Sequence, residues 1–485
     1  MDVPYQTVPI HLTVKFSAWS NRCGLILADL VGFAVAFTLS QWFVSNGENT
    51  YSLLVDTVSG QARVWSYLAL AVAGIGWFWS HRRHYTYRKP FWNELREVII
   101  TIFALAVADL AFAALSRWEF SRIHWALLWS LAFLFVPSSR YIMKLFLTKI
   151  GYWQWPSVII GCGSNAKEAY LAIQSEKIMG FDIIGFVAPD DSCMQSPVTD
   201  KPLFRDDISV LVEHFKEAKF FIAVEYEQRE LRDNWIRYLT QRGIRNISVI
   251  PTLRGVPLYG TDMSHFFSHE VLMLRVRNNL ARFSARLLKR LFDLSVSSLL
   301  LLLLSPLLGY IAWKVSRDGG SPIYGHERVG RGGNKFKCLK FRSMIINSQE
   351  VLNELLTRDS EARAEWEKDF KLKNDPRITS IGHFIRKTSL DELPQLWNVF
   401  KGEMSLVGPR PVVQQELARY GDDAEYYLLT NPGMTGLWQV SGRNDTDYAT
   451  RVYLDAWYVK NWSLWYDIAI LFKTINVVLK RDGAY

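Results

Sequence analysis

The sequence predicts a membrane-associated protein of combined α and α/β class, organised in three domains. The 485 residues are 49% hydrophobic and 14% aromatic, which is high for a soluble protein. Four apolar runs occupy the first 150 residues, and short strands and helices alternate from Trp155 onward. We therefore expect a four-helix transmembrane domain at 1–150, a Rossmann-like α/β domain at 151–280, and a third domain at 281–485 that carries a re-entrant membrane helix.

The apolar runs of the first domain are candidate transmembrane helices. They are Leu25–Val44, Val64–Trp79, Val98–Leu115 and Ile123–Val136, the last with an extension towards Leu147. The second run and the core of the fourth are shorter than the roughly 20 residues of a spanning helix, but aromatic flanks extend them into the interface. Five arginines and lysines separate the second run from the third, against one between the first and second. The positive-inside rule then places both ends of the domain in the cytoplasm.

Charged residues and cysteines exclude several functional classes. The formal charge of +9 indicates cytoplasmic loops and anionic lipid, and no zinc-finger or RNA-binding signature accompanies it, so we do not expect nucleic acid as a partner. The four cysteines form no C-x-x-C pair, which predicts reduced structural thiols. No cleavable signal peptide is evident.

Asp29 and Asp109 lie within spans, where helix packing is favoured over an ion pathway because no chain of relay groups follows them.

The second domain shows a βαβ pattern. A strand at Ser157–Ile160 leads into the turn Gly161–Ala166 and an amphipathic helix that ends near Glu176. Further strands are expected at Asp182–Val187, Phe220–Val224 and Ile247–Ile250. The turn has the form G-x-G-x-x-A, which indicates the fold more strongly than a bound dinucleotide. A degenerate scaffold or regulatory domain fits equally well, so we assign this domain no cofactor.

A fifth apolar run, Leu291–Trp313, predicts a helix that enters the membrane without crossing it. It is long enough to span, yet basic residues flank both of its ends. Pro306 lies near its middle and removes a helical hydrogen bond, and the Ser305 hydroxyl can satisfy the carbonyl that is freed. We therefore expect a re-entrant helix at about 286–316 that breaks at Ser305–Pro306. The alternative is a kinked fifth span.

Aromatic and basic residues also alternate near the C-terminus, between Tyr453 and Trp465. This pattern is typical both of a membrane interface and of core packing.

The adjacent carboxylates Asp391 and Glu392 are the strongest candidate functional residues. Basic residues surround them in the sequence, which suits chemistry on phosphates. Because proline is tolerated in the first turn of a helix, Pro394 predicts a helix that starts near Asp391 and stops at Gly402. Ser389 and Glu392 also fit a capping box, and on local residues alone capping and function remain even alternatives.

Several ordered segments resemble the polyprenyl-phosphate hexose-1-phosphate transferases, the monotopic type of phosphoglycosyl transferase. They are Ser305–Pro306, Gly325–Gly330, Lys340–Met344, Lys387–Gln395, Ser405–Pro411 and Pro432–Gln439. The resemblance covers about residues 289–485. The preceding spans and α/β segment look like the long bacterial subgroup that acts in O-antigen and capsule assembly, most of all its undecaprenyl-phosphate galactose phosphotransferases.

The resemblance implies specific roles for these residues. The family transfers a sugar 1-phosphate from a UDP-hexose to undecaprenyl phosphate and releases UMP. Asp391 matches its nucleophile, which forms a phosphosugar–aspartyl intermediate, and Glu392 matches its Mg²⁺-associated carboxylate. Arg386 and Arg410 match phosphate-contacting positions, and Lys340 and Arg342 lie in a family motif that we assign to phosphate or headgroup contacts.

The same resemblance implies the cofactor, the partners and the location. We expect Mg²⁺ held by Glu392 and Asp391, UDP-galactose as the favoured UDP-hexose, contact with membrane lipid, a homodimer, and the bacterial inner membrane with both soluble domains on the cytoplasmic side. UDP-glucose as donor, sugar transfer without the phosphate, and a membrane-tethered nucleotide-sugar sensor or scaffold are the competing hypotheses.

Overall fold

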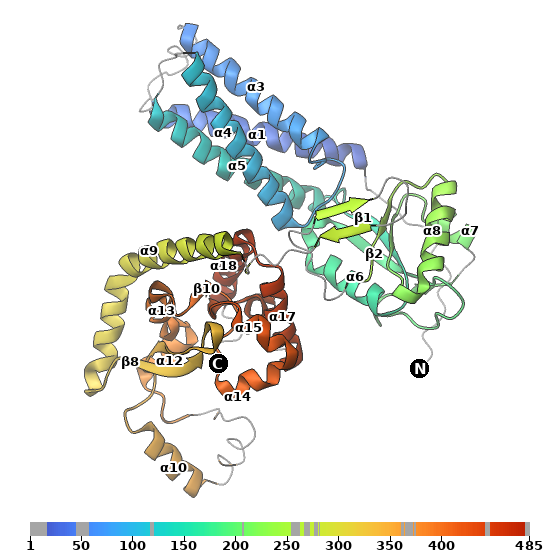
Figure 1. Cartoon of the computed structure of the whole chain (residues 1–485). Helices are drawn as coiled ribbons and strands as arrows, with labels where there is room; N and C mark the ends of the chain where they lie inside the picture. The colour runs from blue at the N-terminus through green and yellow to red at the C-terminus, as the bar shows by residue number, and fades with distance from the viewer. Residues whose placement is uncertain are drawn as a thin grey trace. The chain divides into compact units, whose positions relative to one another are not determined.

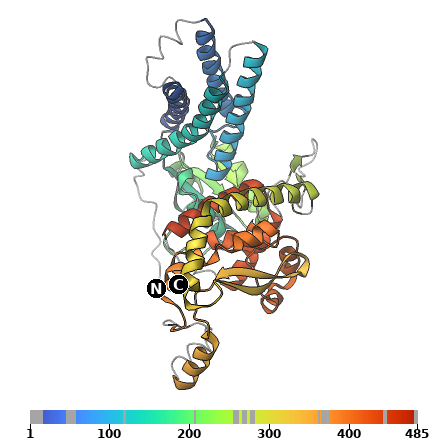
Figure 2. The same cartoon turned by 90° about the vertical axis from the view of Figure 1, so that its left-hand side faces the viewer.

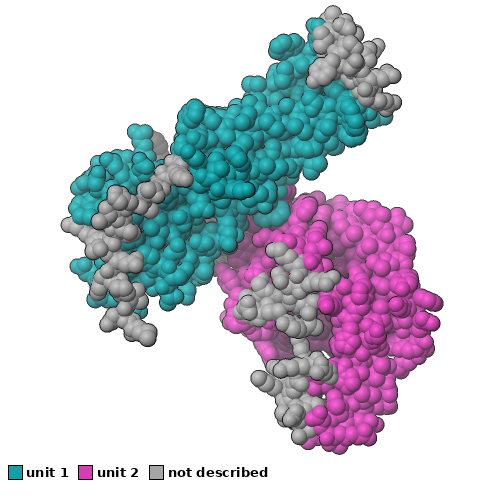
Figure 3. Space-filling view, turned by 180° about the vertical axis from the view of Figure 1, so that it is seen from behind, with its two compact units in different colours: residues 1–253 teal, residues 254–485 magenta. Residues whose placement is uncertain are grey.

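The structure is a computed structural model. It describes residues 17–44, 58–116, 121–205, 208–253, 262–265, 272–275, 280, 282–359, 363, 372, 375–441 and 447–480. The chain forms two compact units, Met1–Leu253 and Arg254–Tyr485, which are coloured separately in Figure 3. The expected boundary between the second and third domains, at 280–281, adjoins residues 276–279 and 281, which lie outside the described residues. The three-domain division therefore stays a prediction.

The first unit begins with a helix at each of the four apolar runs (Figure 1). These helices are α1 (Ala18–Val44), α3 (Val58–Ser80), α4 (Phe91–Leu115) and α5 (Arg122–Lys149). The expected extension of the fourth run to Leu147 is confirmed. Among the described helices, four are long and apolar enough to cross a membrane: α1, α4, α5, and the segment Phe283–Asp318 of the second unit. The protein is therefore membrane-associated.

Buried charges connect the membrane helices to one another. Asp29 on α1 is fully buried and pairs with Arg140 on α5, while the Tyr85 hydroxyl donates to the same carboxylate at 2.5 Å. Asp109 on α4 accepts a hydrogen bond from the Trp129 indole at 2.9 Å. Both acids thus contact α5, which agrees with the packing interpretation, and the ion pair of Asp29 avoids the cost of an unpaired buried charge.

A parallel five-stranded sheet follows in the order β3-β2-β1-β4-β5. Its elements in chain order are β1 (Trp155–Ile160), α6 (Ser164–Ser175), η1 (Lys177–Met179), β2 (Phe181–Val187), β3 (Leu203–Phe204), α7 (Ile208–His214), β4 (Lys219–Ile222), η2 (Tyr226–Gln228), α8 (Arg229–Gln241) and β5 (Ile247–Val249). Buried side chains on alternate positions of β1 feed two separate cores, one on each face of the sheet. The four expected strands are present, and the short β3 was not predicted.

The turn between β1 and α6 already contains an internal anion. The Glu225 carboxylate accepts hydrogen bonds from the Asn165 backbone N–H at 2.8 Å and from the Ser164 hydroxyl at 3.1 Å, so it occupies the N-terminus of α6. A side chain at Gly163 would clash with the same carboxylate. In dinucleotide-binding folds a phosphate occupies this position. The geometry therefore supports leaving this domain without a cofactor.

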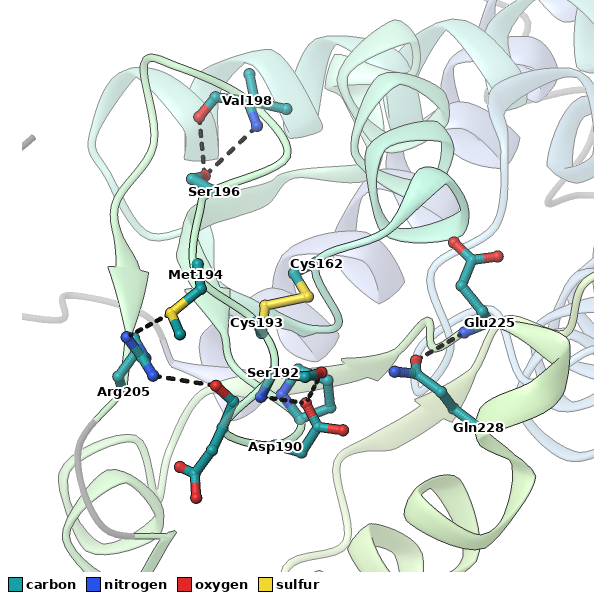
Figure 4. Close-up of a disulfide and its surroundings, with 12 residues drawn as sticks. Cys162, Asp190, Ser192, Cys193, Met194, Ser196, Val198, Arg205, Glu225 and Gln228 are labelled. Carbon is teal, nitrogen blue, oxygen red and sulfur yellow. Dashed lines mark hydrogen bonds between the residues drawn. A yellow bond between two sulfur atoms is a disulfide. The ribbon is translucent and has the colours of Figure 1, made fainter.

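The expectation of four reduced thiols is wrong for two of the cysteines. Cys162 and Cys193 are joined in a disulfide, with their Cα atoms 6.1 Å apart, and Figure 4 shows the bond beside the loop that follows β2. The reason is topological: β1 and β2 are parallel neighbours, so the segments after their carboxyl ends meet although 31 residues separate the two cysteines. Cys23 and Cys338 are free.

The second unit places short strands among many helices. The elements up to the helix that follows the Asp391–Glu392 pair, called the dyad below, are β6 (Asp262–His265), β7 (Leu272–Arg275), α9 (Phe283–Val315), η3 (Ser316–Asp318), β8 (Ile323–Val329), η4 (Arg331–Gly333), β9 (Lys335–Phe341), α10 (Ser348–Arg358), α12 (Ser380–Lys387), η5 (Leu390–Glu392) and α13 (Gln395–Lys401). The remainder comprises β10 (Ser405–Val407), α14 (Gln414–Leu417), η6 (Ala418–Asp423), α15 (Ala424–Leu428), β11 (Gly433–Thr435), α16 (Leu437–Ser441), α17 (Tyr448–Lys460) and α18 (Leu464–Lys480). Strands β8 and β9 form an antiparallel hairpin, and β10 pairs in parallel with β11.

Helix α9 is sharply bent, as Figures 1 and 2 both show. Pro306 lies inside the helix and cannot donate to the carbonyl of Leu302, four residues earlier. The Ser305 hydroxyl donates to that same carbonyl at 2.8 Å. The predicted substitution of a serine hydroxyl for the missing N–H is therefore confirmed.

Buried polar groups hold the first half of α9 on the second unit. The Lys289 ammonium is 2.8 Å from the Asp467 carboxylate and 3.0 Å from the Val407 carbonyl. One turn later, Asp293 accepts hydrogen bonds from the Ser405 hydroxyl and the Leu406 N–H, at 2.8 and 3.1 Å. Because every partner is itself buried, these bonds fix the helix in one register.

The aromatic segment near the C-terminus contains both core and exposed residues, so core packing is confirmed for part of it, and the membrane interface stays a prediction. Tyr458 and Trp462 are buried in the core, and both donate hydrogen bonds to Asp467. Tyr453 is 53% exposed on the same helix as Tyr458.

Candidate active site

The two carboxylates lie on a short 3₁₀ turn directly ahead of a helix. Ser389 has a left-handed backbone (φ 56°), and η5 and then Pro394 lead into α13, which Gly402 ends in the left-handed conformation. The expected stop is confirmed, whereas the helix begins four residues later than Asp391. Ser389 makes no side-chain cap, and the Glu392 carboxylate bonds to Lys340 instead. The capping-box alternative is therefore wrong.

The apolar residues of α13 are divided between core and surface. Leu396 and Val399 are buried, at 2% and 0% exposure. Trp397 and Phe400 are 45% and 37% exposed and stack on each other with ring centroids 5.3 Å apart.

A cavity of about 810 Å³ brings the six predicted polar site residues together. Asp391, Glu392, Lys340, Arg342, Arg386 and Arg410 all line it. Three further arginines also line it: Arg328, Arg377 and Arg451. The cavity thus holds two adjacent carboxylates within a cationic lining, an arrangement that suits a substrate with several phosphate charges.

Lys340 on β9 pairs with both carboxylates. Its ammonium lies 2.7 Å from Glu392 Oε1 and 3.9 Å from Asp391 Oδ2. Buried Asn398 on α13 sets this distance, because its side-chain amide accepts from the Leu339 N–H at 3.0 Å and donates to the Lys337 carbonyl at 2.8 Å. The strand that carries the lysine and the helix that follows the dyad are therefore locked together.

Asp391 is the more buried of the two acids, with a side chain that is 15% exposed. Burial raises the pKa of Asp391 to about 6, and the charge of Glu392 adds to this effect, while Lys340 and Arg386 oppose it. The carboxyl is still mostly ionised at pH 7, yet its negative charge is poorly solvated. A poorly solvated carboxylate next to cations is suited to nucleophilic attack.

Arg386 and Arg377 lie with Asp391 in the cavity lining. The Arg386 Nε donates to the Ser343 hydroxyl at 2.8 Å, and burial lowers the pKa of Arg386. Arg377 makes a bidentate pair with Asp375, at 2.8 and 2.7 Å. Arg377 is thus neutralised locally, whereas the charge of Arg386 acts on Asp391.

Arg410 follows β10 in a turn that glycines make possible. A side chain at Gly433 would lie 2.1 Å from the Gly408 nitrogen, so the two strands approach each other only without one. The Arg410 guanidinium is 5.5 Å from the centre of the Trp438 ring, and the Arg451 guanidinium is 5.0 Å from the same ring. Both distances are typical of cation–π pairs.

Arg451, Trp438 and Asp455 are site residues that the sequence reasoning did not assign. Asp455 lies one turn after Arg451 on α17 and is 2% exposed. Burial raises the pKa of Asp455 to about 7, while hydrogen bonds from the Tyr420 hydroxyl and the Arg410 backbone oppose the shift. Trp438 belongs to a matched family segment and was identifiable from it. Arg451 lies outside every matched segment, so only the tertiary structure shows its position.

Arg342 lines the cavity with every donor committed elsewhere. Its five N–H groups donate to two oxygens of Asp318 and to the carbonyls of Val315, Ser321 and Met344. The predicted phosphate contact would require breaking at least one of these bonds. The observed contacts tie the end of α9 to β9.

The two carboxylates of the dyad fit Mg²⁺ only if a substrate supplies further oxygen ligands. Within the described part of the chain, no group of three or more histidine, cysteine, aspartate or glutamate side chains could hold a metal ion. Asp391 and Glu392 supply two carboxylates, and Mg²⁺ is commonly bound by one or two carboxylates together with water and substrate phosphates. The half-exposed Glu392 would have to exchange its ammonium partner for the metal.

Paired carboxylates in a cationic cavity of a membrane-associated protein are typical of enzymes that act on phosphate groups. The family model described as bacterial sugar transferase matches residues 284–481, which include all of α9 except its first residue and the whole cavity. The UDP-galactose-lipid carrier transferase of Erwinia amylovora is 55% identical over 98% of this chain and 100% of its own length. The undecaprenyl-phosphate galactose phosphotransferase of Salmonella typhimurium is 53% identical over 97% and 99%.

The chain belongs to the bacterial sugar transferase family, and it is a transferase. The resemblance found in the sequence motifs is thereby confirmed. A more distant similarity, 40% identity over 41% of this chain and 42% of the relative, connects it to the UDP-glucose:undecaprenyl-phosphate glucose-1-phosphate transferase of Escherichia coli.

Proposed function

We propose that this protein transfers hexose 1-phosphate from a UDP-hexose to undecaprenyl phosphate, releases UMP, and thereby starts the assembly of a surface polysaccharide. The observation that carries the proposal is the Asp391–Glu392 dyad in its cationic cavity, within the segment that matches the family. Galactose is the favoured sugar because two relatives named for galactose match almost the full chain. UDP-glucose is the alternative donor.

The first chemical step uses Asp391 as a nucleophile. A carboxylate oxygen of Asp391 attacks the β-phosphorus of the donor and forms a new P–O bond, while the bond from that phosphorus to the bridging oxygen breaks. UMP leaves with the electron pair of the broken bond, and hexose 1-phosphate stays on the aspartate. Ionisation of Asp391 favours this step at neutral pH, since its pKa is about 6.

The second step returns the enzyme to its starting state. An oxygen of undecaprenyl phosphate attacks the same phosphorus, the P–O bond to Asp391 breaks, and the carboxylate is regenerated. The product is undecaprenyl diphosphate hexose. Two displacements at one aspartate allow the water-soluble donor and the lipid acceptor to use the same cavity in turn.

The cationic lining binds and orients the phosphates during both steps. Arg386 lines the cavity together with Asp391, so we assign it to the oxygens of the phosphate under attack. Arg410 and Arg451, both against Trp438, supply a pair of guanidinium groups for the other phosphate. Glu392, with Asp391 and substrate oxygens, would hold Mg²⁺, which would neutralise charge on the phosphates. We assign Arg342 the structural role of holding α9 against β9.

The membrane topology that fits this chemistry keeps the cavity at the cytoplasmic surface of the bacterial inner membrane. In this arrangement α1, α3, α4 and α5 span the membrane, the parallel sheet forms a Rossmann-like cytoplasmic domain, and the bent α9 enters and returns on the same face. The bend at Pro306 and the exposed leucines of α9 support a re-entrant path. A homodimer is proposed from family resemblance alone.

A membrane assay with several UDP-sugars, undecaprenyl phosphate and Mg²⁺ tests the function. We expect UMP and a lipid diphosphate sugar as products, with UDP-galactose as the best donor. UDP without UMP would contradict phosphosugar transfer. Without acceptor, labelled UMP should exchange into the donor, because the first step is reversible. Asp391→Asn should abolish both reactions with folding preserved, and Glu392→Gln should weaken the dependence on Mg²⁺.

The topology has a separate test. Single cysteines placed after Lys314 should react with a membrane-impermeant reagent from the same side as cysteines near Arg83. Labelling from opposite sides would establish α9 as a fifth span.

A further inference from the structure

A second cationic cavity lies beside the first half of α9, away from the dyad. It has a volume of about 250 Å³ and is formed by α9, the segment after α13 and the residues before β11. Its charged lining consists of four cations and one acid, which are Arg286, Lys289, Arg290, Arg331 and Asp293. Among the described residues, the linings of the two cavities have no member in common.

Internal partners account for only part of this charge. Lys289 is paired with Asp467, and Asp293 accepts hydrogen bonds from Ser405 and Leu406. The Arg290 guanidinium donates to the carbonyls of Val399 and Phe400, at 2.6 and 2.7 Å, so it covers the end of α13. These groups form the wall of the cavity, and each already has a hydrogen-bond or ion-pair partner within the protein.

Arg286 is different because its buried Nε donor has no acceptor within the described structure. A buried donor without an acceptor lowers the stability of the fold, and such donors are uncommon unless a ligand or a water molecule accepts the hydrogen bond. Arg331 adds a second guanidinium from the turn between β8 and β9, on the same lining. Two guanidinium groups and one unfilled donor favour an oxyanion, since a guanidinium fork matches the oxygens of a phosphate.

The position of α9 indicates where this anion comes from. Several large apolar residues are exposed on the first half of α9: Phe283 is 73%, Leu288 49% and Leu291 53% exposed. A helix with one apolar face and one cationic face lies in the plane of the membrane interface. Its cationic face is then at the depth of the lipid phosphates.

We propose that this cavity binds the phosphate group of an anionic membrane lipid, separately from the sugar-transfer cavity. Arg286 and Arg331 hold the phosphate oxygens, and the satisfied groups around them keep the site open. The bound lipid fixes the depth of the first half of α9 in the bilayer. This site does not depend on the sugar-transfer reaction, because its residues are distinct from those of the dyad cavity.

Thermal unfolding of the full-length detergent-solubilised protein tests the proposal. The probes are a short-chain phosphatidylglycerol, a phosphatidylcholine of the same chain length, and inorganic phosphate, all at constant ionic strength. Arg286→Gln/Arg331→Gln is the test variant. Arg282→Gln is the matched control, since Arg282 is an exposed arginine at the start of α9 outside the cavity lining.

We expect phosphatidylglycerol to raise the unfolding temperature of the wild type and of Arg282→Gln in a saturable way. The double variant should bind it at least tenfold more weakly, and phosphatidylcholine should have little effect. Equal binding by the control and the double variant would overturn the site. A saturable effect of inorganic phosphate alone, at similar affinity, would overturn the lipid assignment in favour of a free anion.

A second variant covers the case in which the double substitution prevents folding. Arg286→Lys keeps the positive charge and loses the guanidinium fork together with the unfilled Nε donor. We expect about tenfold weaker binding of phosphatidylglycerol, with retention of the lipid also measured by native mass spectrometry. Unchanged retention would refute the role of Arg286.

Discussion

Replacing Lys340 by glutamine should move the acid limb of the pH–activity profile. The ammonium lies 3.9 Å from Asp391, a distance at which two unit charges interact by about 1 kcal/mol in water and about 4 kcal/mol at an effective dielectric constant of 20. The lysine side chain is 41% exposed, so solvent screening favours the lower part of this range. We take about 1.4 kcal/mol, which corresponds to about one pKa unit.

The sign follows from the charge that is removed. Lys340 stabilises the ionised form of Asp391 and thereby lowers its pKa, so its loss raises the pKa from about 6 to about 7. The glutamine variant then needs a higher pH to ionise its nucleophile. At pH 6.5 the ionised fraction falls about threefold, whereas at pH 8 it changes by only about a tenth.

The assay is kcat/KM for sugar-phosphate transfer between pH 5.5 and 8.5. Lys335→Gln is the control, because Lys335 lies on the same strand, pairs with Glu327 and does not line the cavity. A loss of activity that is uniform across pH would show that Lys340 binds phosphate without tuning Asp391. An acid limb that moves to lower pH would refute the electrostatic reasoning altogether.

Three further predictions concern Asp391, Arg451 and Arg342. Asp391→Asn should raise the free energy of unfolding at pH 8 by up to about 3 kcal/mol, because the pKa of Asp391 is about 6 in the folded state and 3.8 in the unfolded state, so the ionised acid destabilises the fold. This gain should vanish below pH 4, and thermal unfolding at both pH values measures it. Arg451→Gln should raise KM for the UDP-sugar about tenfold with unchanged unfolding temperature, whereas Arg419→Gln, outside the cavity lining, should not. Arg342→Lys should lower the free energy of unfolding by about 1–2 kcal/mol with little change in KM, since lysine keeps the charge but cannot replace the five hydrogen bonds. A large rise in KM in a stable variant would instead support the phosphate contact that the sequence predicted for Arg342.

Local features of the sequence were sufficient for the bend in α9, and they singled out Asp391 and Glu392, whose roles came only from the family resemblance. Pro394 predicts a helix that starts near the two acids, which is correct to within four residues, and Ser305 before Pro306 predicts a hydroxyl that replaces the missing N–H. Each inference depends on residues within one or two helical turns of each other. Short-range stereochemistry of this kind is readable from the chain alone.

Long-range pairs could not be predicted in the same way. Lys340 and Glu392 are 52 residues apart, and neither local sequence indicates that these two side chains form an ion pair. The same holds for Cys162 and Cys193, which meet because two strands are parallel neighbours. The exposure of Trp397 and Phe400 also depends on what packs against α13, which periodicity does not specify.

The positions of the arginines in the second unit explain why charge alone was a poor guide to their roles. Arg342 and Arg290 donate to backbone carbonyls or to a structural acid, so each fixes one element against another. Arg386 donates to one hydroxyl and acts electrostatically on the buried nucleophile. A guanidinium with all five donors committed can add a bond to phosphate only by losing one, whereas one with donors to spare gains the full charge-assisted bond. The number of uncommitted donors, which only the folded structure reveals, therefore separates the arginines that build the cavity from those available to its substrate.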